Sequence, residues 1–64
     1  MKNNIKFLRK QQGLRQEDVA KKLGVTRQTI NAIENDKYNP TLELAMKLAR
    51  LFNTPVEEIF QLDN

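Results

Sequence analysis

The chain has 64 residues and a formal net charge of +3, with no cysteine and no histidine. A domain of this size buries only about 60% of the surface that its unfolded chain exposes, and no disulfide or thiolate zinc site can reinforce it. Without histidine or cysteine the commonest groups of nucleophilic and acid–base catalysis are missing, so we expect no enzyme, no metal site and no cofactor.

The first half of the chain predicts three helices. The first is expected over residues 4–12, and Gly13 ends it in the left-handed conformation that glycine tolerates. The second is expected over residues 16–23. The third begins after Thr26, whose hydroxyl can accept hydrogen bonds from the free amides of a first helical turn.

A break in the helical pattern separates the third helix from the fourth. In the segment KYNPT, Pro40 disfavours helix at the residue before it, and Thr41 can cap the next helix. The fourth helix is expected to turn these residues toward the core: Leu42, Ala45, Leu48, Ala49 and Phe52.

The sequence TPVE marks the start of a short fifth helix. Thr54 is expected to cap it, Pro55 to take the first helical position, and Glu57 to complete a capping box. Residues 61–64 are then expected to fray or to add a brief strand. The fold class is therefore all-α: a compact five-helix single domain over residues 1–64, with a possible short C-terminal strand.

Residues 16–35, QEDVAKKLGVTRQTINAIEN, have the spacing of a helix-turn-helix. Ala20 lies where the second helix of the motif must approach closely, Gly24 opens the turn, and Val25 closes it from below. The second helix then protrudes as a rod about 10–12 Å wide, which fits the ~12 Å major groove of B-DNA. The motif predicts a DNA-binding regulator.

The charge is divided unevenly along the chain. Residues 1–38 hold nine Lys and Arg against four Asp and Glu, a net +5, whereas residues 39–64 hold two against four, a net −2. The basic half contains the helix-turn-helix, so we expect this half to be attracted to phosphate.

The outward face of the third helix supplies the candidate base-reading residues. Arg27 has the forked donors that suit guanine, whereas Gln28 and Asn31 have the paired donor and acceptor that suit adenine. Ala32 offers a methyl contact to thymine. The competing interpretation is that polar residues on an exposed face merely keep the protein soluble.

Phosphate contacts are expected on either side of the reading helix, because such contacts fix the register of a protein on DNA. Gln16 would gain from the positive end of its own helix. Asn35 has an equally good alternative role as the C-cap of the third helix. The candidate phosphate-binding residues are Arg15, Gln16, Thr26, Thr29, Asn35, Lys37 and Tyr38.

The stretch LRQEDVAKKLGVTRQTINAIENDKYNPTLELAMKLARLF resembles the Cro/C1-type (XRE) helix-turn-helix family of phage repressors and bacterial regulators. The motifs RQTIN, KYNP and NTPVEEIF are most similar to its small stand-alone repressors, such as the cytolysin repressor. The resemblance implies five helices, groove contacts from Arg27, Gln28 and Asn31, and a phosphate contact from Gln16. It further implies a dimeric, operator-binding protein without a separate sensor domain.

The same resemblance implies one ion pair, and at two positions this sequence departs from the pattern of the family. Arg9 and Glu34 match a charged pair that in this family links the first helix to the third. Arg15 stands where relatives usually place a Ser or Thr cap, so the second helix is expected to begin more weakly. Asp36 stands where relatives usually place Gly, which is expected to strain the backbone and to put a negative charge near DNA.

A homodimer is expected because the fourth helix is apolar around most of its circumference, and Phe7 falls off the inward face of the first helix. For Val56 and Ile59, closing the core of the monomer is an equally good explanation. The candidate interface residues are Phe7, Leu51, Val56, Ile59, Phe60 and Leu62.

The main function hypothesis is a repressor that binds an inverted-repeat operator in double-stranded DNA. The alternatives are an antitoxin-like module that binds a regulatory protein partner and uses DNA for autoregulation, and a non-specific architectural DNA binder, which the lopsided charge opposes. No apolar run approaches the ~20 residues of a membrane span, and MKNNIK lacks the apolar stretch of a signal peptide. We therefore expect a cytoplasmic protein without a membrane partner.

Overall fold

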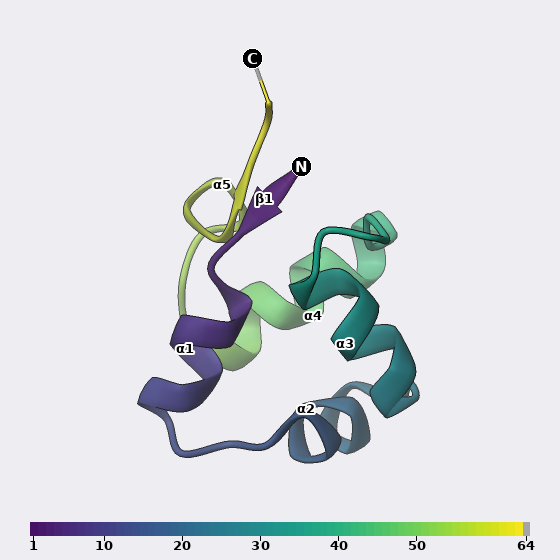
Figure 1. The fold of residues 1–64 in the computed structure, drawn as a ribbon. Helices are drawn as coiled ribbons and strands as arrows, with labels where there is room; N and C mark the ends of the chain where they lie inside the picture. The colour runs from purple at the N-terminus through teal and green to yellow at the C-terminus, as the bar shows by residue number, and fades with distance from the viewer. Residues whose placement is uncertain (64) are drawn as a thin grey trace.

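Five helices and one two-stranded sheet form the fold, which a computed structural model describes for residues 1–63. α2 and α3 meet at one end of the molecule, α4 lies behind α1 and α3, and the two termini lie together at the opposite end (Figure 1). Asn64, the end of the predicted tail, lies outside the described residues. In chain order the elements are β1 (Lys2–Asn3), α1 (Ile5–Gln11), α2 (Gln16–Leu23), α3 (Arg27–Glu34), α4 (Leu42–Phe52), α5 (Val56–Ile59) and β2 (Phe60–Gln61).

The predicted caps and turn of the first four helices are confirmed. The hydroxyl oxygen of Thr26 accepts a hydrogen bond from the backbone N–H of Thr29 at 3.2 Å, and that of Thr41 accepts from Leu44 at 3.2 Å. Gly24 adopts a φ of +74° between α2 and α3, a conformation that side chains with a Cβ rarely take. The sharp reversal at this glycine brings α3 back across α2.

The start of α5 differs from the prediction. Thr54 does not cap the helix: its hydroxyl donates a hydrogen bond to the carbonyl oxygen of Phe52 at 2.8 Å. Pro55 has an extended ψ of 147° and precedes the helix, which begins one residue later than expected, at Val56. No side chain of the described residues caps α5, so the predicted capping box with Glu57 is wrong.

One core of twelve buried apolar side chains joins all five helices to β2. The prediction that Leu42 points into the core is wrong. Its side chain is 74% exposed, and Leu44 is buried instead. With about 100° of rotation per residue, Leu42 lies roughly 120° from the centre of the stripe formed by Leu44, Leu48 and Phe52. The core consists of Ile5, Val19, Ala20, Leu23, Ile30, Ile33, Leu44, Ala45, Leu48, Phe52, Ile59 and Phe60.

The sheet joins segments near the two termini and confirms a short C-terminal strand, which begins at Phe60, one residue earlier than expected. β1 and β2 are antiparallel, with Lys2 opposite Gln61 and Asn3 opposite Phe60. The backbone N–H of Asn4 also donates to the carbonyl oxygen of Ile59 at 2.9 Å. The segments near the two termini are therefore hydrogen-bonded to each other, on the side of the molecule away from the turn between α2 and α3.

Two of the predicted dimer residues belong to the core of a single chain. Ile59 is 0% exposed and Phe60 is 8% exposed, so neither side chain offers an appreciable surface to a partner. The prediction that they form a dimer interface is therefore corrected: both side chains belong to the buried core of the single chain.

Candidate nucleic-acid interface

The amphipathic sequence of α3 divides the helix into a buried face and an outer face. Ile30 and Ile33 anchor the helix, each only 1% exposed. Arg27, Gln28 and Asn31 are exposed on the outer side, as helical geometry requires of residues that do not share the isoleucine positions.

Ala32 and Thr29 are half-buried along the edges of α3. The backbone carbonyl of Ala32 accepts a hydrogen bond from the N–H of Lys37 at 2.9 Å, so the segment that leaves α3 folds back beside this residue. The methyl group of Ala32 is therefore less accessible than the three polar side chains of the outer face.

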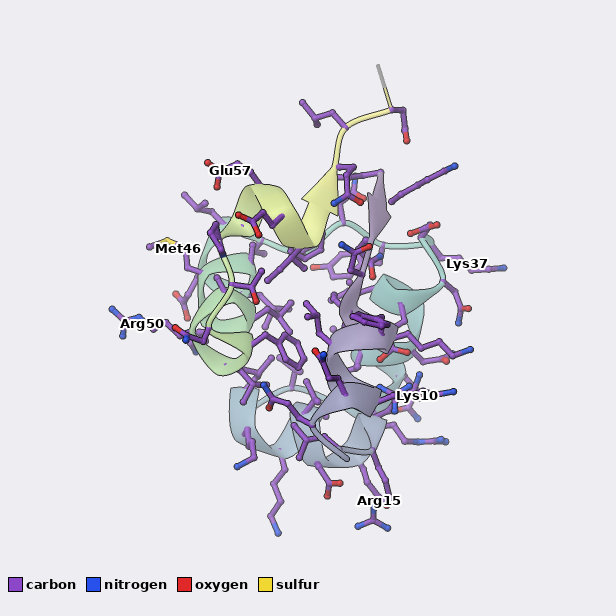
Figure 2. All side chains as sticks on the ribbon, turned by 90° about the vertical axis from the view of Figure 1, so that its left-hand side faces the viewer. Lys10, Arg15, Lys37, Met46, Arg50 and Glu57 are labelled. Atoms are coloured by element: carbon purple, nitrogen blue, oxygen red, sulfur yellow. The ribbon has the colours of Figure 1, made fainter. Side chains whose placement is uncertain are left out.

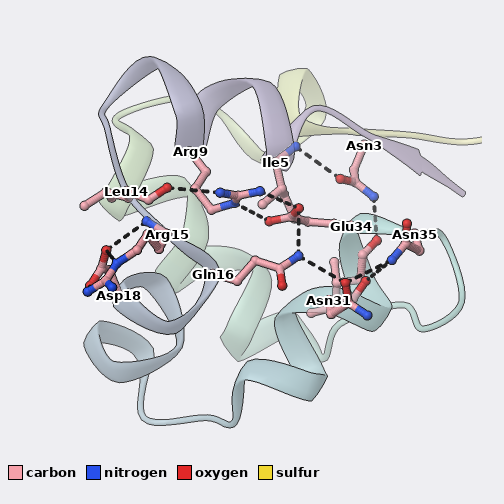
Figure 3. Close-up of polar contacts among 11 residues, drawn as sticks. Asn3, Ile5, Arg9, Leu14, Arg15, Gln16, Asp18, Asn31, Glu34 and Asn35 are labelled. Carbon is pink, nitrogen blue, oxygen red and sulfur yellow. Dashed lines mark hydrogen bonds and ion pairs between the residues drawn. The ribbon is translucent and has the colours of Figure 1, made fainter.

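A buried ion pair holds α3 against α1. The Nε of Arg9 lies 2.7 Å from Oε2 of Glu34, and a second guanidinium nitrogen lies 3.1 Å from Oε1, so the contact is bidentate (Figure 3). The two side chains are only 10% and 3% exposed. Hydrogen bonding to Glu34, partly offset by burial, raises the pKa of Arg9 above its usual value. A third bond from Arg9 to the carbonyl of Leu14 at 3.0 Å ties in the segment before α2.

A chain of side-chain amides continues from this ion pair to the outer face of α3. The Nε2 of Gln16 donates both to Oε1 of Glu34 at 3.2 Å and to Oδ1 of Asn31 at 3.1 Å. Asn35, the C-cap of α3, donates to the backbone oxygen of Asn31 at 2.9 Å and to its Oδ1 at 3.1 Å. Figure 3 shows these bonds as one continuous path from Arg9 to Asn35.

The start of α2 is held by a carboxylate rather than by a capping hydroxyl. Arg15 has no side-chain acceptor, but Asp18 accepts a hydrogen bond from the backbone N–H of Arg15 at 2.8 Å and another from its Nε at 3.2 Å. Glu17 lies 2.8 Å from the same guanidinium. These contacts take the place of the Ser or Thr cap, whose absence was expected to weaken the start of α2.

The contacts at this helix start also shift two pKa values. The backbone hydrogen bond from Arg15, followed by the bond from its side chain, lowers the pKa of Asp18. The pKa of Arg15 is raised, first by the side-chain hydrogen bond to Asp18 and then by the charges of Asp18 and Glu17. Arg15 is thus neutralised locally, which opposes its predicted role as a phosphate contact.

The remaining predicted phosphate contacts flank the outer face of α3. The hydroxyls of Thr26 and Thr29 hydrogen-bond to each other at 3.0 Å. Lys37 and Tyr38 are exposed beyond the C-terminal end of the helix. Figure 2 shows Lys37, Arg15 and also Lys10 projecting on the side of the molecule away from Met46 and Arg50. Lys10 was not among the predicted contacts.

Asp36 follows α3 with a φ of +60°, the left-handed conformation that the comparison with glycine anticipated. Its carboxylate accepts a hydrogen bond from the Nδ2 of Asn3 at 3.0 Å, and the same nitrogen donates to the carbonyl of Ile33 at 2.8 Å. The Oδ1 of Asn3 accepts from the backbone N–H of Ile5 at 3.1 Å. Asn3 therefore joins the end of α3 to the start of α1, a role that sequence patterns did not indicate.

Comparison with known proteins identifies the family. A profile described as helix-turn-helix matches residues 5–59. The chain belongs to the Cro/C1-type helix-turn-helix family of transcriptional regulators. Like other members of this family it is a DNA-binding regulator rather than an enzyme.

Relatives that match this regulator over most of their own length occur in archaea and bacteria. It is 57% identical over 60 residues to an uncharacterized HTH-type transcriptional regulator of Methanocaldococcus jannaschii, covering 94% of this chain and 91% of that one. The Bacillus subtilis regulator YgzD is 44% identical over 63 residues, covering 98% and 96% of the two chains. These relatives support the family and not the narrower resemblance to the cytolysin repressor.

A solved structure supports the fold. The restriction-modification controller protein C.AhdI of Aeromonas hydrophila superposes on this regulator with a TM-score of 0.79 at 30% identity, over 89% of this chain and 86% of that one.

Within residues 1–63, no helix of the regulator is long and apolar enough to cross a membrane.

Four of the predicted interface residues keep exposed apolar surface, but not all at one end of the molecule: Leu51 borders Lys22 and Leu23 of α2, whereas Val56 and Leu62 border Met1. Leu62 is 78% exposed beyond β2, and Phe7 is 67% exposed on α1. Leu51 and Val56 are half-buried against the core. These four are the predicted interface residues that the fold of one chain leaves at least partly accessible.

Proposed function

We propose that this regulator is a repressor that binds an inverted-repeat operator as a homodimer, with α3 of each subunit in the major groove. The observation that carries the proposal is the outer face of α3: Arg27, Gln28 and Asn31 are exposed, while the Arg9–Glu34 ion pair fixes the helix to α1. A rigidly mounted helix that presents polar side chains is suited to direct readout.

In the proposed complex, Arg27, Gln28 and Asn31 contact base edges and Ala32 lies beside a thymine methyl group. Thr26, Thr29, Lys37 and Tyr38 contact phosphates, together with Arg15 and the backbone N–H of Gln16 at the start of α2. The side-chain N–H groups of Gln16 and Asn35 are already bonded to Asn31 and Glu34, so neither side chain donates to a phosphate. Arg15 must release Glu17 or Asp18 to contact a phosphate, and we therefore assign it the weakest role.

The proposed dimer interface is built from Phe7, Leu51, Val56 and Leu62. Burying exposed apolar side chains stabilises a small domain, and a two-fold axis would set two reading helices about 34 Å apart. Binding of such a dimer over a promoter would exclude other proteins from the DNA. The Vibrio cholerae phage protein RstR, 37% identical over 57 residues, is a transcriptional repressor, and this chain spans 51% of its length.

Selection from a random DNA pool near physiological salt tests the proposal, because non-specific binding is weak there. We expect an enriched inverted repeat with half-sites one helical turn apart. Arg27→Ala or Gln28→Ala should weaken binding to the selected site by about 1–3 kcal/mol and leave binding to random DNA nearly unchanged. A folded protein that enriches no sequence would contradict the proposal.

A second candidate function is supported by the exposed face of α4. Leu42 and Met46 are uncovered there, flanked by Arg50 and by the ion pair between Glu43 and Lys47. Such a face is suited to a regulatory protein partner, as in the antitoxin-like alternative. Sequence-specific binding by the purified protein alone would favour the repressor, whereas selection that succeeds only with a partner protein present would favour the alternative.

A further inference from the structure

The side chain of Asn31 has a donor end and an acceptor end, and its neighbours decide which end faces the outside. The two ends have nearly the same shape, so their orientation follows from the polarity of the groups that they contact. Two sets of neighbouring groups determine the orientation of the Asn31 amide: Gln16 with the buried ion pair, and the C-cap residue Asn35.

The first set of groups begins at the buried ion pair. A guanidinium only donates and a carboxylate only accepts, so the Oε1 of Glu34, which already accepts from Arg9, requires a donor from Gln16. The atom of Gln16 that faces Glu34 is therefore Nε2. The same nitrogen lies 3.1 Å from the side chain of Asn31, which must present its oxygen there.

The second set of groups lies at the C-cap of α3. The backbone carbonyl of Asn31 only accepts, so Asn35 must turn its Nδ2 toward this carbonyl, 2.9 Å away. That nitrogen is also 3.1 Å from the side chain of Asn31. Both sets of groups thus assign Oδ1 to the inner end of Asn31.

These contacts leave only the N–H donors of the Asn31 side chain available to DNA. Its Oδ1 accepts from both Gln16 and Asn35, which fills the two lone-pair positions of an amide oxygen. Its Nδ2 donates to no group within residues 1–63, and the residue is exposed on the outer face of α3.

We propose that Asn31 reads DNA as a donor, and that Gln16 and Asn35 are positioning residues that fix this polarity. In the major groove guanine presents two acceptors, N7 and O6, whereas adenine presents one acceptor and one donor. The donor end of Asn31 therefore selects guanine over adenine, which replaces the adenine preference expected from its side-chain type alone. This inference rests on the proposed function of α3 as the reading helix.

The orientation can be measured without DNA. In the ¹⁵N-labelled wild-type protein, we expect the side-chain NH₂ protons of Gln16 to exchange with water markedly more slowly than those of Asn31, because the former bond to a buried carboxylate. Slow exchange at Asn31 together with unprotected protons at Gln16 would mean the opposite polarity and would overturn the proposal. This result does not depend on whether the protein reads a DNA sequence.

The consequence for DNA is tested by pool selection with the wild type, Asn31→Ala and Asn35→Ala. The base position that loses its preference in Asn31→Ala should favour guanine over adenine by at least about fivefold in the wild type. Asn35→Ala frees one lone pair of Oδ1, so this ratio should fall severalfold. Asn53→Gly, which removes the asparagine at the C-cap of α4, is the matched control and should retain the wild-type preference.

The other possible outcomes contradict the donor role of Asn31, the positioning role of Asn35 or the proposed function. An adenine preference at this position, or no position that depends on Asn31, would overturn the donor role while leaving a sequence-reading regulator in place. An unchanged ratio in Asn35→Ala would overturn the positioning role of Asn35, because Gln16 alone would then hold Oδ1 inward. Failure of the wild type to enrich any sequence would instead overturn the proposed function, and the exchange measurement would still decide the orientation of Asn31.

Discussion

Glu34 carries a negative charge into the core between α1 and α3, where its side chain is only 3% exposed. Glu34→Ala would leave the guanidinium of Arg9 buried without its partner, which typically lowers the free energy of unfolding by about 3–5 kcal/mol. A domain of this size has a total stability of the same order, so the variant should be largely unfolded at ambient temperature. Urea denaturation followed by circular dichroism measures the loss.

The matched control for this residue replaces both partners. Arg9→Met combined with Glu34→Leu removes both charges and keeps most of the volume, and buried pairs replaced in this way often cost little. We expect the double variant to be more stable than Glu34→Ala. If the two variants unfold at the same urea concentration, loss of packing rather than an unpaired charge explains the effect.

Asp36 combines a left-handed backbone with a negative charge close to the end of the proposed reading helix. Asparagine tolerates this φ better and retains an oxygen that can accept from Asn3, so Asp36→Asn should fold as well as the wild type. Removing the charge should raise affinity for DNA severalfold at low salt, for specific and random sequences alike. Fluorescence anisotropy at several salt concentrations measures this effect, and an effect confined to one sequence would contradict a simple charge repulsion.

At the scale of the helix, Asp18 makes the start of α2 sensitive to acid. Its pKa is lowered mainly by the backbone hydrogen bond from Arg15, so the charged carboxylate stabilises the folded state. This contribution is fully present above the pKa of the unfolded chain, about 3.9, and is lost as the pH falls through the lower folded-state pKa. The stability difference between wild type and Asp18→Asn should thus be constant above about pH 5 and shrink below about pH 4.

Thermal melts of the two proteins between pH 7 and pH 2.5 measure this difference. Glu57→Gln, at an exposed position of α5, is the control for a general loss of negative charge. A stability difference that persists unchanged to the lowest pH would show that the charge of Asp18 does not support α2.

The helix ends show which features of the fold are readable from sequence. Thr26 and Thr41 cap the helices that they were predicted to cap, because each directly precedes an amphipathic segment long enough to pack. Thr54 precedes a helix of four residues, and its hydroxyl bonds to the preceding helix instead. Local capping patterns are thus reliable when the helix behind them is anchored by the core.

Contacts between distant segments were less predictable. Asn3 lies thirty-three positions from Asp36, and no local pattern indicates that the two side chains meet. The exposed residues of α3 followed from periodicity, whereas the orientation of the Asn31 amide depends on Gln16 and Asn35 and required the structure. The sequence therefore predicted which residues face outward, but not the polarity that Asn31 presents.

For the whole molecule, the division of charge has a measurable consequence. Residues 1–38 carry a net +5 and contain α2 and α3, whereas residues 39–64 carry a net −2. If each subunit neutralises about four phosphates and two subunits bind together, the logarithm of the association constant should fall with the logarithm of salt concentration at a slope of about −7.

Binding titrations on the selected operator between about 50 and 200 mM salt measure this slope. Lys37→Ala should make it shallower by about one unit for each subunit that contacts DNA, and hence by about two in a dimer. Leu62→Asp should weaken association of the subunits, because it places a charge in the proposed apolar interface. At protein concentrations where this variant is monomeric by sedimentation, a single half-site should give about half the wild-type slope. A full slope from a monomer would mean that one subunit alone makes all the phosphate contacts, which would overturn the proposed two-fold arrangement.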